Sequence, residues 1–163
     1  MSNISMTTSK RNAIVTVMLI SAFVSMLNQT ILNTALPAII KGLNITETTA
    51  QWLITGFMLV NGIMIPLTAF LMDKYSTRHL YIFSMAIFLI GSIIAAFSPT
   101  FTILMISRII QAIGAGILLP LMQFTVFTLF PAEQRGFAMG LAGVVVQSAP
   151  AIGPTLTGLF VDL

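Results

Sequence analysis

The sequence predicts an all-α membrane protein, a polytopic bundle of five transmembrane helices. Of its 163 residues, 57% are hydrophobic and only 7% are charged, and the mean hydropathy is +1.03. Soluble domains carry about 25% charged residues, so this chain has too few charges to cover a surface that faces water. The second observation is a series of five long apolar stretches. A helix needs about 20 mainly apolar residues to cross a bilayer, and each stretch is of about that length.

The first two predicted spans follow a short polar segment. Residues 1–11 are expected to form a cytoplasmic N-terminus, and the first span covers about 12–36, before Pro37. A secretory signal peptide is the alternative for this span, but its apolar run is long for one and no small-residue cleavage site follows it. The second span covers about 51–72 and ends at a charged segment that begins with Asp73.

The remaining three spans are separated by short polar turns. The third covers about 80–97, the fourth about 101–129 and the fifth about 136–161. Residues 12–163 are therefore expected to form one partial transmembrane bundle. Five spans are too few for a transporter built from repeated halves, so we expect the N-terminal part of a longer protein.

Basic residues predict the orientation of the bundle. With the N-terminus in the cytoplasm, five of them lie on the inner side: Lys10, Arg11, Lys74, Arg78 and Arg135. Only Lys41 then lies outside, and the opposite orientation would reverse this positive-inside bias. We expect a multi-pass protein of the cell membrane, surrounded by the lipid bilayer.

The composition argues against enzymes and nucleic-acid binders. The chain has no cysteine, and hence no thiolate metal ligand or cysteine nucleophile. Its net charge of +3 comes from scattered residues rather than from a basic stripe that could follow phosphates. No Gly-rich phosphate-binding loop with Lys and Ser or Thr is present. We therefore expect no covalent catalysis, no cofactor, no metal and no nucleic acid.

Arg108 lies within the fourth predicted span. A central arginine costs about 2.5–3.5 kcal/mol of insertion free energy, so its side chain must face protein or water rather than lipid. Gln111, three residues later, lies on the same helical face. Two interpretations remain open. Arg108 lines a cavity for substrate or proton coupling, or it is a structural arginine that bonds a helix end or extends to the interface.

Two further patterns involve polar or small residues in apolar spans. Asn28, Thr30 and Asn33 of the first span cannot be satisfied by lipid. They either line a wet path or hydrogen-bond neighbouring helices. In the fifth span, small or kinking residues recur every three or four positions, which predicts a tight, bent helix contact. These residues are Gly136, Gly140, Gly143, Gln147, Pro150 and Pro154.

Four segments together resemble one family. They read LNQTILNTALP at 27–37, LMDKYSTR at 71–78, RIIQAIGAG at 108–116 and APAIGPTLTG at 149–158. In this order they resemble signatures of the major facilitator superfamily. Within it, they are similar to the fourteen-helix drug:proton antiporters of the lincomycin-resistance type.

The resemblance implies an N-terminal part of a proton-coupled multidrug efflux transporter. Its partners would be small amphipathic drugs, protons and further C-terminal helices. It implies a substrate path or proton-coupling role for Asn28, Thr30, Asn33, Arg108 and Gln111. It implies a cytoplasmic gate at Asp73, Lys74 and Arg78, and an antiporter-motif helix bend at Pro150, Gly153, Pro154 and Gly158.

The chain departs from the family pattern in its charges. The first-helix motif often has Asp where this chain has Asn28, and no acidic residue lies in the middle of a span. A carboxylate that carries protons would therefore come from other segments. Two alternative functions remain, which are transport of an endogenous small solute and a non-transporting membrane scaffold.

Overall fold

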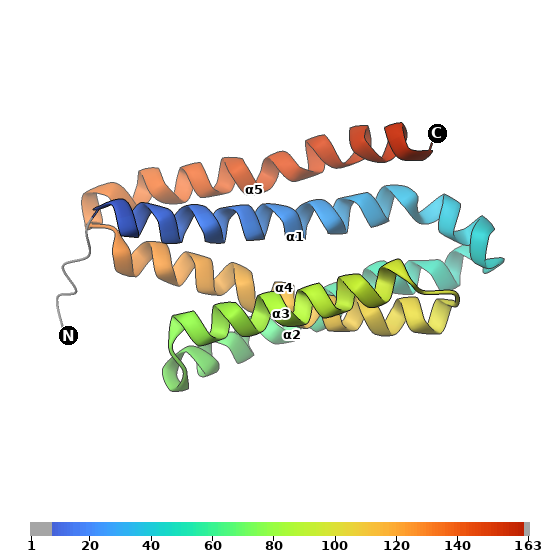
Figure 1. The fold of residues 1–163 in the computed structure, drawn as a ribbon, viewed down its shortest axis with the longest axis horizontal. Coiled ribbons are helices and arrows are strands. Elements are labelled where there is room, and N and C mark those ends of the chain that lie inside the picture. Colours follow the sequence, from blue (N-terminus) through green and yellow to red (C-terminus); the bar gives the residue numbers. More distant parts are fainter. Residues whose placement is uncertain (1–7, 162–163) are drawn as a thin grey trace.

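The chain folds almost entirely into helices. The computed structural model describes the backbone of residues 8–161 and the side chains of residues 8–155. Five helices follow one another, α1 (Thr8–Leu43), α2 (Glu47–Lys74), α3 (Thr77–Ala96), α4 (Phe101–Leu129) and α5 (Ala132–Val161) (Figure 1). Each is long and apolar enough to cross a membrane, and no strand occurs among the described residues. The predicted fold class, an all-α transmembrane bundle of five helices, is confirmed.

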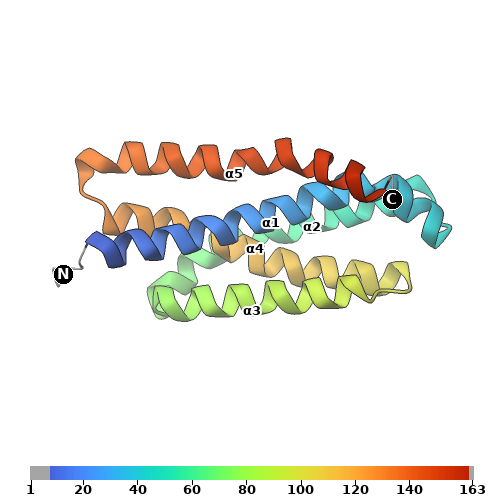
Figure 2. The same ribbon diagram turned by 45° about the horizontal axis from the view of Figure 1, so that its top comes forward.

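The helices run up and down along one common direction (Figures 1 and 2). The start of α1, the α2–α3 turn and the α4–α5 turn lie at one end of the molecule. The α1–α2 and α3–α4 turns lie at the other end. All basic residues at helix ends except Lys41 therefore gather at the end where α1 begins.

The five helices form two groups. α1 packs mainly against α5, although about 90 residues separate them in the chain, and only slightly against α2. α2 and α3 both pack against α4, which also contacts α1 and α5. α4 has more buried residues than any other helix, so it is the centre of the bundle.

Glycines allow α4 to approach its neighbours closely. A Cβ atom at Gly114 would lie 2.6 Å from the carbonyl oxygen of Ser84 in α3, and one at Gly116 would lie 2.5 Å from Cβ of Met64 in α2. These distances are too short for carbon atoms, so only glycine fits at both positions. Small residues commonly bring membrane helices together in this way, and here they place the middle of α4 between α2 and α3.

Some helix limits differ from the expected ones. α1 continues through Pro37 to Leu43, where the sequence predicted an end at Leu36. α5 likewise passes through Pro150 and Pro154 without a break. Proline removes one backbone donor but keeps a helical φ, and membrane helices tolerate it where neighbours compensate. α2 begins at Glu47 because Thr46 caps it, its hydroxyl accepting a hydrogen bond from the backbone N–H of Thr49 at 3.2 Å.

Candidate functional site

The candidate site centres on Arg108 in the middle of the bundle. Its side chain is fully buried, with 0% of its surface exposed. One terminal nitrogen, Nη1, donates to Oε1 of Gln111 at 2.9 Å and to Oδ1 of Asn28 at 3.4 Å. The first partner lies one turn away on α4, as the spacing predicted, and the second lies on α1. Arg108 therefore faces protein rather than lipid.

Two further helices complete the surroundings of Arg108. The guanidinium carbon lies 4.2 Å from the centre of the Phe57 ring of α2, in a cation–π contact. Gln111 passes the network on to α3, because its Nε2 donates to Oγ of Ser92 at 3.1 Å. Side chains from four helices thus surround one positive charge.

The guanidinium of Arg108 makes only some of the hydrogen bonds that it can donate. Nε and Nη2 are both buried and lack a hydrogen-bond partner within the described part of the chain. No carboxylate contacts Arg108 there, and the two side chains that accept hydrogen bonds from it are both neutral amides. A buried arginine without a counter-ion is costly unless something else pairs with it. This unpaired charge is the main chemical feature of the site.

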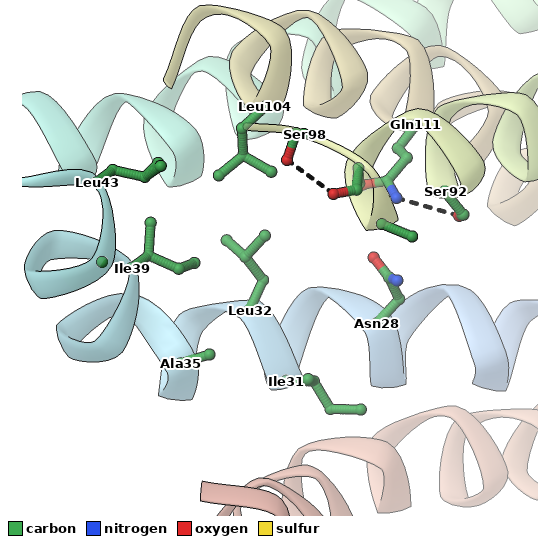
Figure 3. Close-up of a pocket in the computed structure, with 13 residues that line it drawn as sticks. Asn28, Ile31, Leu32, Ala35, Ile39, Leu43, Ser92, Ser98, Leu104 and Gln111 are labelled. Atoms are coloured by element: carbon green, nitrogen blue, oxygen red, sulfur yellow. Dashed lines mark hydrogen bonds between the residues drawn. The ribbon is translucent and has the colours of Figure 1, made fainter. Parts of the chain in front are cut away.

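A cavity of about 570 Å³ opens beside this network, between α1, α3 and α4. Asn28, Ser92 and Gln111 line its inner part, and apolar residues such as Leu32 and Leu104 line much of the rest. Figure 3 shows Asn28 and Leu32 pointing from α1 towards α3 and α4, with Ser92 and Gln111 opposite Asn28. The volume is in the range of small-molecule sites, which are mostly apolar with a few polar groups.

The structure separates two predicted residues from this site. Thr30 lies half-buried against α5, and its hydroxyl donates to the carbonyl oxygen of Met26 in its own helix at 2.9 Å. Asn33 is exposed. The site therefore brings together Asn28, Arg108 and Gln111, while Thr30 and Asn33 lie on another face of α1.

Phe57 and Ser92 belong to the site but were not predicted from the sequence. Phe57 looks like any other aromatic residue of an apolar span, so its contact with Arg108 has no local signal. The pair Gly91–Ser92 interrupts the apolar third span. This interruption is the sequence signal that could have identified Ser92. Glycine and serine are both enriched where membrane helices contact each other.

The three residues of the predicted gate lie near the α2–α3 turn and are all exposed. Asp73 and Lys74 end α2, and Arg78 lies in the first turn of α3. No ion pair joins Asp73 to either basic residue, and Lys74 lies over the Phe70 ring at 4.4 Å. Arg78 also lines a second, mainly apolar cavity of about 690 Å³ between α1, α3 and α4.

The residues of the predicted bend lie along the last part of α5. Gly153 is buried, Pro150 is half-buried and Pro154 is exposed. A Cβ atom at Gly153 would lie 2.7 Å from Cγ2 of Thr30, so α5 approaches α1 closely at this glycine. Gly158 lies within α5, but its surroundings are outside the described side chains.

A comparison with known families decides what kind of protein contains this site. The sequence profile described as Major Facilitator Superfamily matches residues 18–163. The chain belongs to the major facilitator superfamily. The predicted resemblance is thereby confirmed, and the family is one of transporters.

Several curated relatives of this facilitator chain are similar over most of its length. It is 54% identical over 152 residues to "Uncharacterized MFS-type transporter YcnB" of Bacillus subtilis (strain 168), covering 93% of this chain and 32% of that protein. It is 45% identical over 145 residues to "Lincomycin resistance protein LmrB" of the same organism, covering 89% and 30%. It is 34% identical over 143 residues to "Probable multidrug resistance protein EmrY" of Escherichia coli (strain K12), covering 88% and 28%. The chain thus spans about a third of the length of these relatives.

Proposed function

We propose that this facilitator chain is part of a proton-coupled transporter that exports small amphipathic drugs across the cell membrane. Two relatives named for lincomycin or multidrug resistance support this choice of cargo. The observation that carries the proposal is the position of Arg108. Its buried charge lies behind two amides, Asn28 and Gln111, which line a cavity of suitable size.

The cavity lining supports an amphipathic substrate. Leu32, Ile39 and Leu104 provide apolar surface for the body of the compound. Asn28, Ser92 and Gln111 provide polar groups that would fix its orientation at the inner end. The apolar and the polar surface lie in different parts of the same cavity. A compound that uses both therefore needs an apolar body and a polar group.

Proton coupling requires a group outside the described spans. A guanidinium stays charged in proteins, so Arg108 cannot itself carry the proton. The described carboxylates, Glu47, Asp73 and Glu133, all lie in the first or last turn of a helix. We infer that the proton carrier belongs to further helices that work with this bundle. The greater length of the relatives leaves room for them.

The same proposal includes the orientation and the moving parts. The end where α1 begins would face the cytoplasm, because it holds most of the basic residues. Asp73, Lys74 and Arg78 would pair with partners in another state of the transport cycle and form a gate there. The segment from Pro150 to Gly158 would form the bend at which α5 adapts, with alternating access by rocking of the bundle.

Drug resistance in a pump-deficient bacterial host tests this function. We expect the full-length transporter to raise the inhibitory concentrations of several unrelated amphipathic drugs, and a protonophore to remove the protection. Arg108→Ala should abolish the protection at unchanged expression, while Lys10→Ala, which removes an exposed charge, should keep it.

Two results would contradict the proposal. Protection against a single metabolite analogue would indicate a transporter of an endogenous solute. Full protection by the Arg108→Ala variant would show that the buried charge has no role in transport.

A further inference from the structure

We propose that Arg108 binds a carboxylate carried by a soluble amphipathic compound, so that this transporter favours substrates with a carboxylate. The inference rests on the proposed function and adds a substrate class to it. The guanidinium of Arg108 is incompletely hydrogen-bonded within the described part of the chain.

The nitrogens of Arg108 that lack a hydrogen-bond partner lie along one edge of the guanidinium. A guanidinium has five N–H donors in a fixed planar arrangement. In Arg108 the contacts to Asn28 and Gln111 both use Nη1, which leaves Nε and Nη2 without a partner among the described residues. The N–H groups of these two nitrogens lie side by side and match the two oxygens of a carboxylate.

The described bundle offers no carboxylate to this edge. Its acidic residues lie at the ends of helices, and Arg108 lies in the middle of α4. Asn28 occupies the position on α1 from which an acid could pair with Nη1, but its amide is neutral. A buried cation in such surroundings favours any anion that can reach it, because the low-dielectric interior strengthens their attraction.

The cavity reaches the two amides that hold Arg108, although Arg108 itself is not part of its lining. Asn28 and Gln111 both line it and both accept from Nη1. The bond to Asn28 is the longer one, 3.4 Å against 2.9 Å, and is therefore the weaker. When the Asn28 amide moves aside, a carboxylate from the cavity can reach the free Nε and Nη2 edge, where it is a stronger acceptor than an amide oxygen.

The shape of the site favours an organic carboxylate over a small inorganic anion. The lining beyond the amides is mostly apolar, with Leu32, Ile39 and Leu104 along it. An aromatic or aliphatic body fits this surface, whereas a halide would leave it empty. The expected ligand is thus an amphipathic carboxylate with its charge at the inner end.

Thermal unfolding of the purified full-length transporter tests the inference with benzoate as the probe. Benzamide is the matched neutral ligand, and sodium chloride is the control for ionic strength. Saturating benzoate should raise the Tm by about 2–5 °C, since a ligand stabilises the state that binds it. Benzamide and chloride should leave the Tm unchanged. An equal shift with chloride, or no shift with benzoate, would overturn the inference.

Asn28→Asp supplies the decisive variant. It places a carboxylate beside Nη1 from within the protein and so neutralises the guanidinium charge, which should remove the benzoate response while the protein stays folded. Asn12→Asp, at an exposed position of the same helix, should keep the response. A benzoate shift that persists in Asn28→Asp would show that benzoate binds elsewhere. Arg108→Gln should also lose the response, but the inference does not depend on that variant folding.

Transport in vesicles separates this inference from the proposed function. Proton-linked transport of an amphipathic cation, without any benzoate binding, would overturn only the carboxylate preference. Benzoate binding that depends on Arg108, without proton-linked transport of any amphipathic compound, would overturn only the proposed efflux. The two failures therefore have different signatures.

Discussion

Gly91 of α3 lies directly against Gln111 of α4. A Cβ atom at position 91 would lie 2.8 Å from Cγ of Gln111 and 2.9 Å from its backbone nitrogen. The missing side chain of one residue thus makes room for the other, which holds Nη1 of Arg108. The packing of α3 on α4 and the position of the buried charge depend on the same contact.

Replacing Gly91 with alanine should therefore affect both stability and transport. The added methyl group forces α3 away from α4, which should cost about 1–3 kcal/mol of unfolding free energy. It should also move Gln111 and so reduce the drug resistance expected from the proposed export. Denaturant unfolding of the purified transporter measures the first effect and inhibitory drug concentrations the second.

Gly140→Ala is the control for this prediction, because nothing lies within 4 Å of a Cβ atom there. It should leave stability unchanged or raise it slightly, as alanine favours a helix. Equal stabilities of the two variants would contradict the role given to Gly91.

The contact between Gly153 and Thr30 predicts a coupled pair of mutations. Gly153→Ala should destabilise the protein, because the new Cβ would lie 2.7 Å from Cγ2 and 2.9 Å from Cβ of Thr30. Rotation of the threonine cannot move its own Cβ. Thr30→Gly removes both atoms, so the double variant should recover part of the loss, with a coupling of about 0.5–3 kcal/mol. Strictly additive changes in unfolding free energy would show that the two helices do not meet there.

Ser92→Ala should have a small effect on transport. It removes the acceptor of Gln111 Nε2 but leaves the bond from Arg108 to Gln111 in place. Side-chain hydrogen bonds between membrane helices contribute about 0.6 kcal/mol on average, which corresponds to roughly a threefold change in affinity. Titration of drug uptake into vesicles measures this change in KM. Ser98→Ala is the control, because Ser98, in the α3–α4 turn, lines the same cavity but its hydroxyl donates to the backbone carbonyl of Ala95 at the end of α3.

Thiol labelling can distinguish the cavity from the lipid-facing surface. The chain has no cysteine, so single cysteines introduced into it are not masked by others of its own. Ala35→Cys, on the cavity wall, should react with a water-soluble maleimide. Ile90→Cys, at a position that is 52% exposed on the outer side of α3, should stay unlabelled because lipid covers it. An Ala35→Cys variant that stays as unlabelled as Ile90→Cys would mean that the cavity is not open to water.

Much of the fold follows from the sequence. Five apolar stretches of sufficient length specify five spans, because an isolated chain in lipid must satisfy its own backbone. The shared face of Arg108 and Gln111 also follows, since residues three apart are neighbours on a helix. Helix ends at prolines were less predictable, and α1 continues beyond Pro37. A rule based on proline alone cannot include the hydrogen bonds and packing with which neighbouring helices compensate for the lost backbone donor.

Which neighbouring helix packs against each helix face could not be predicted from the sequence. Thr30 and Asn33 do lie near one face of α1, but helical spacing does not say which neighbour covers it. The structure places Thr30 against α5 and leaves Asn33 exposed, so their role in the substrate path stays a prediction. Asn28 meets Arg108 across 80 residues of chain, a contact that only the tertiary packing brings about.

The pairing of α1 with α5 has a consequence for biosynthesis. The ribosome releases α1 first, and its main packing partner starts only at Ala132, about 90 residues after Leu43. At about 5–20 residues per second, this delay is roughly 5–18 s. During it, the side of α1 that receives Gly153 must be shielded by lipid or by the insertion machinery. A stall in translation before α5 would thus leave the first helix without its main packing partner, and open to recognition by membrane quality control.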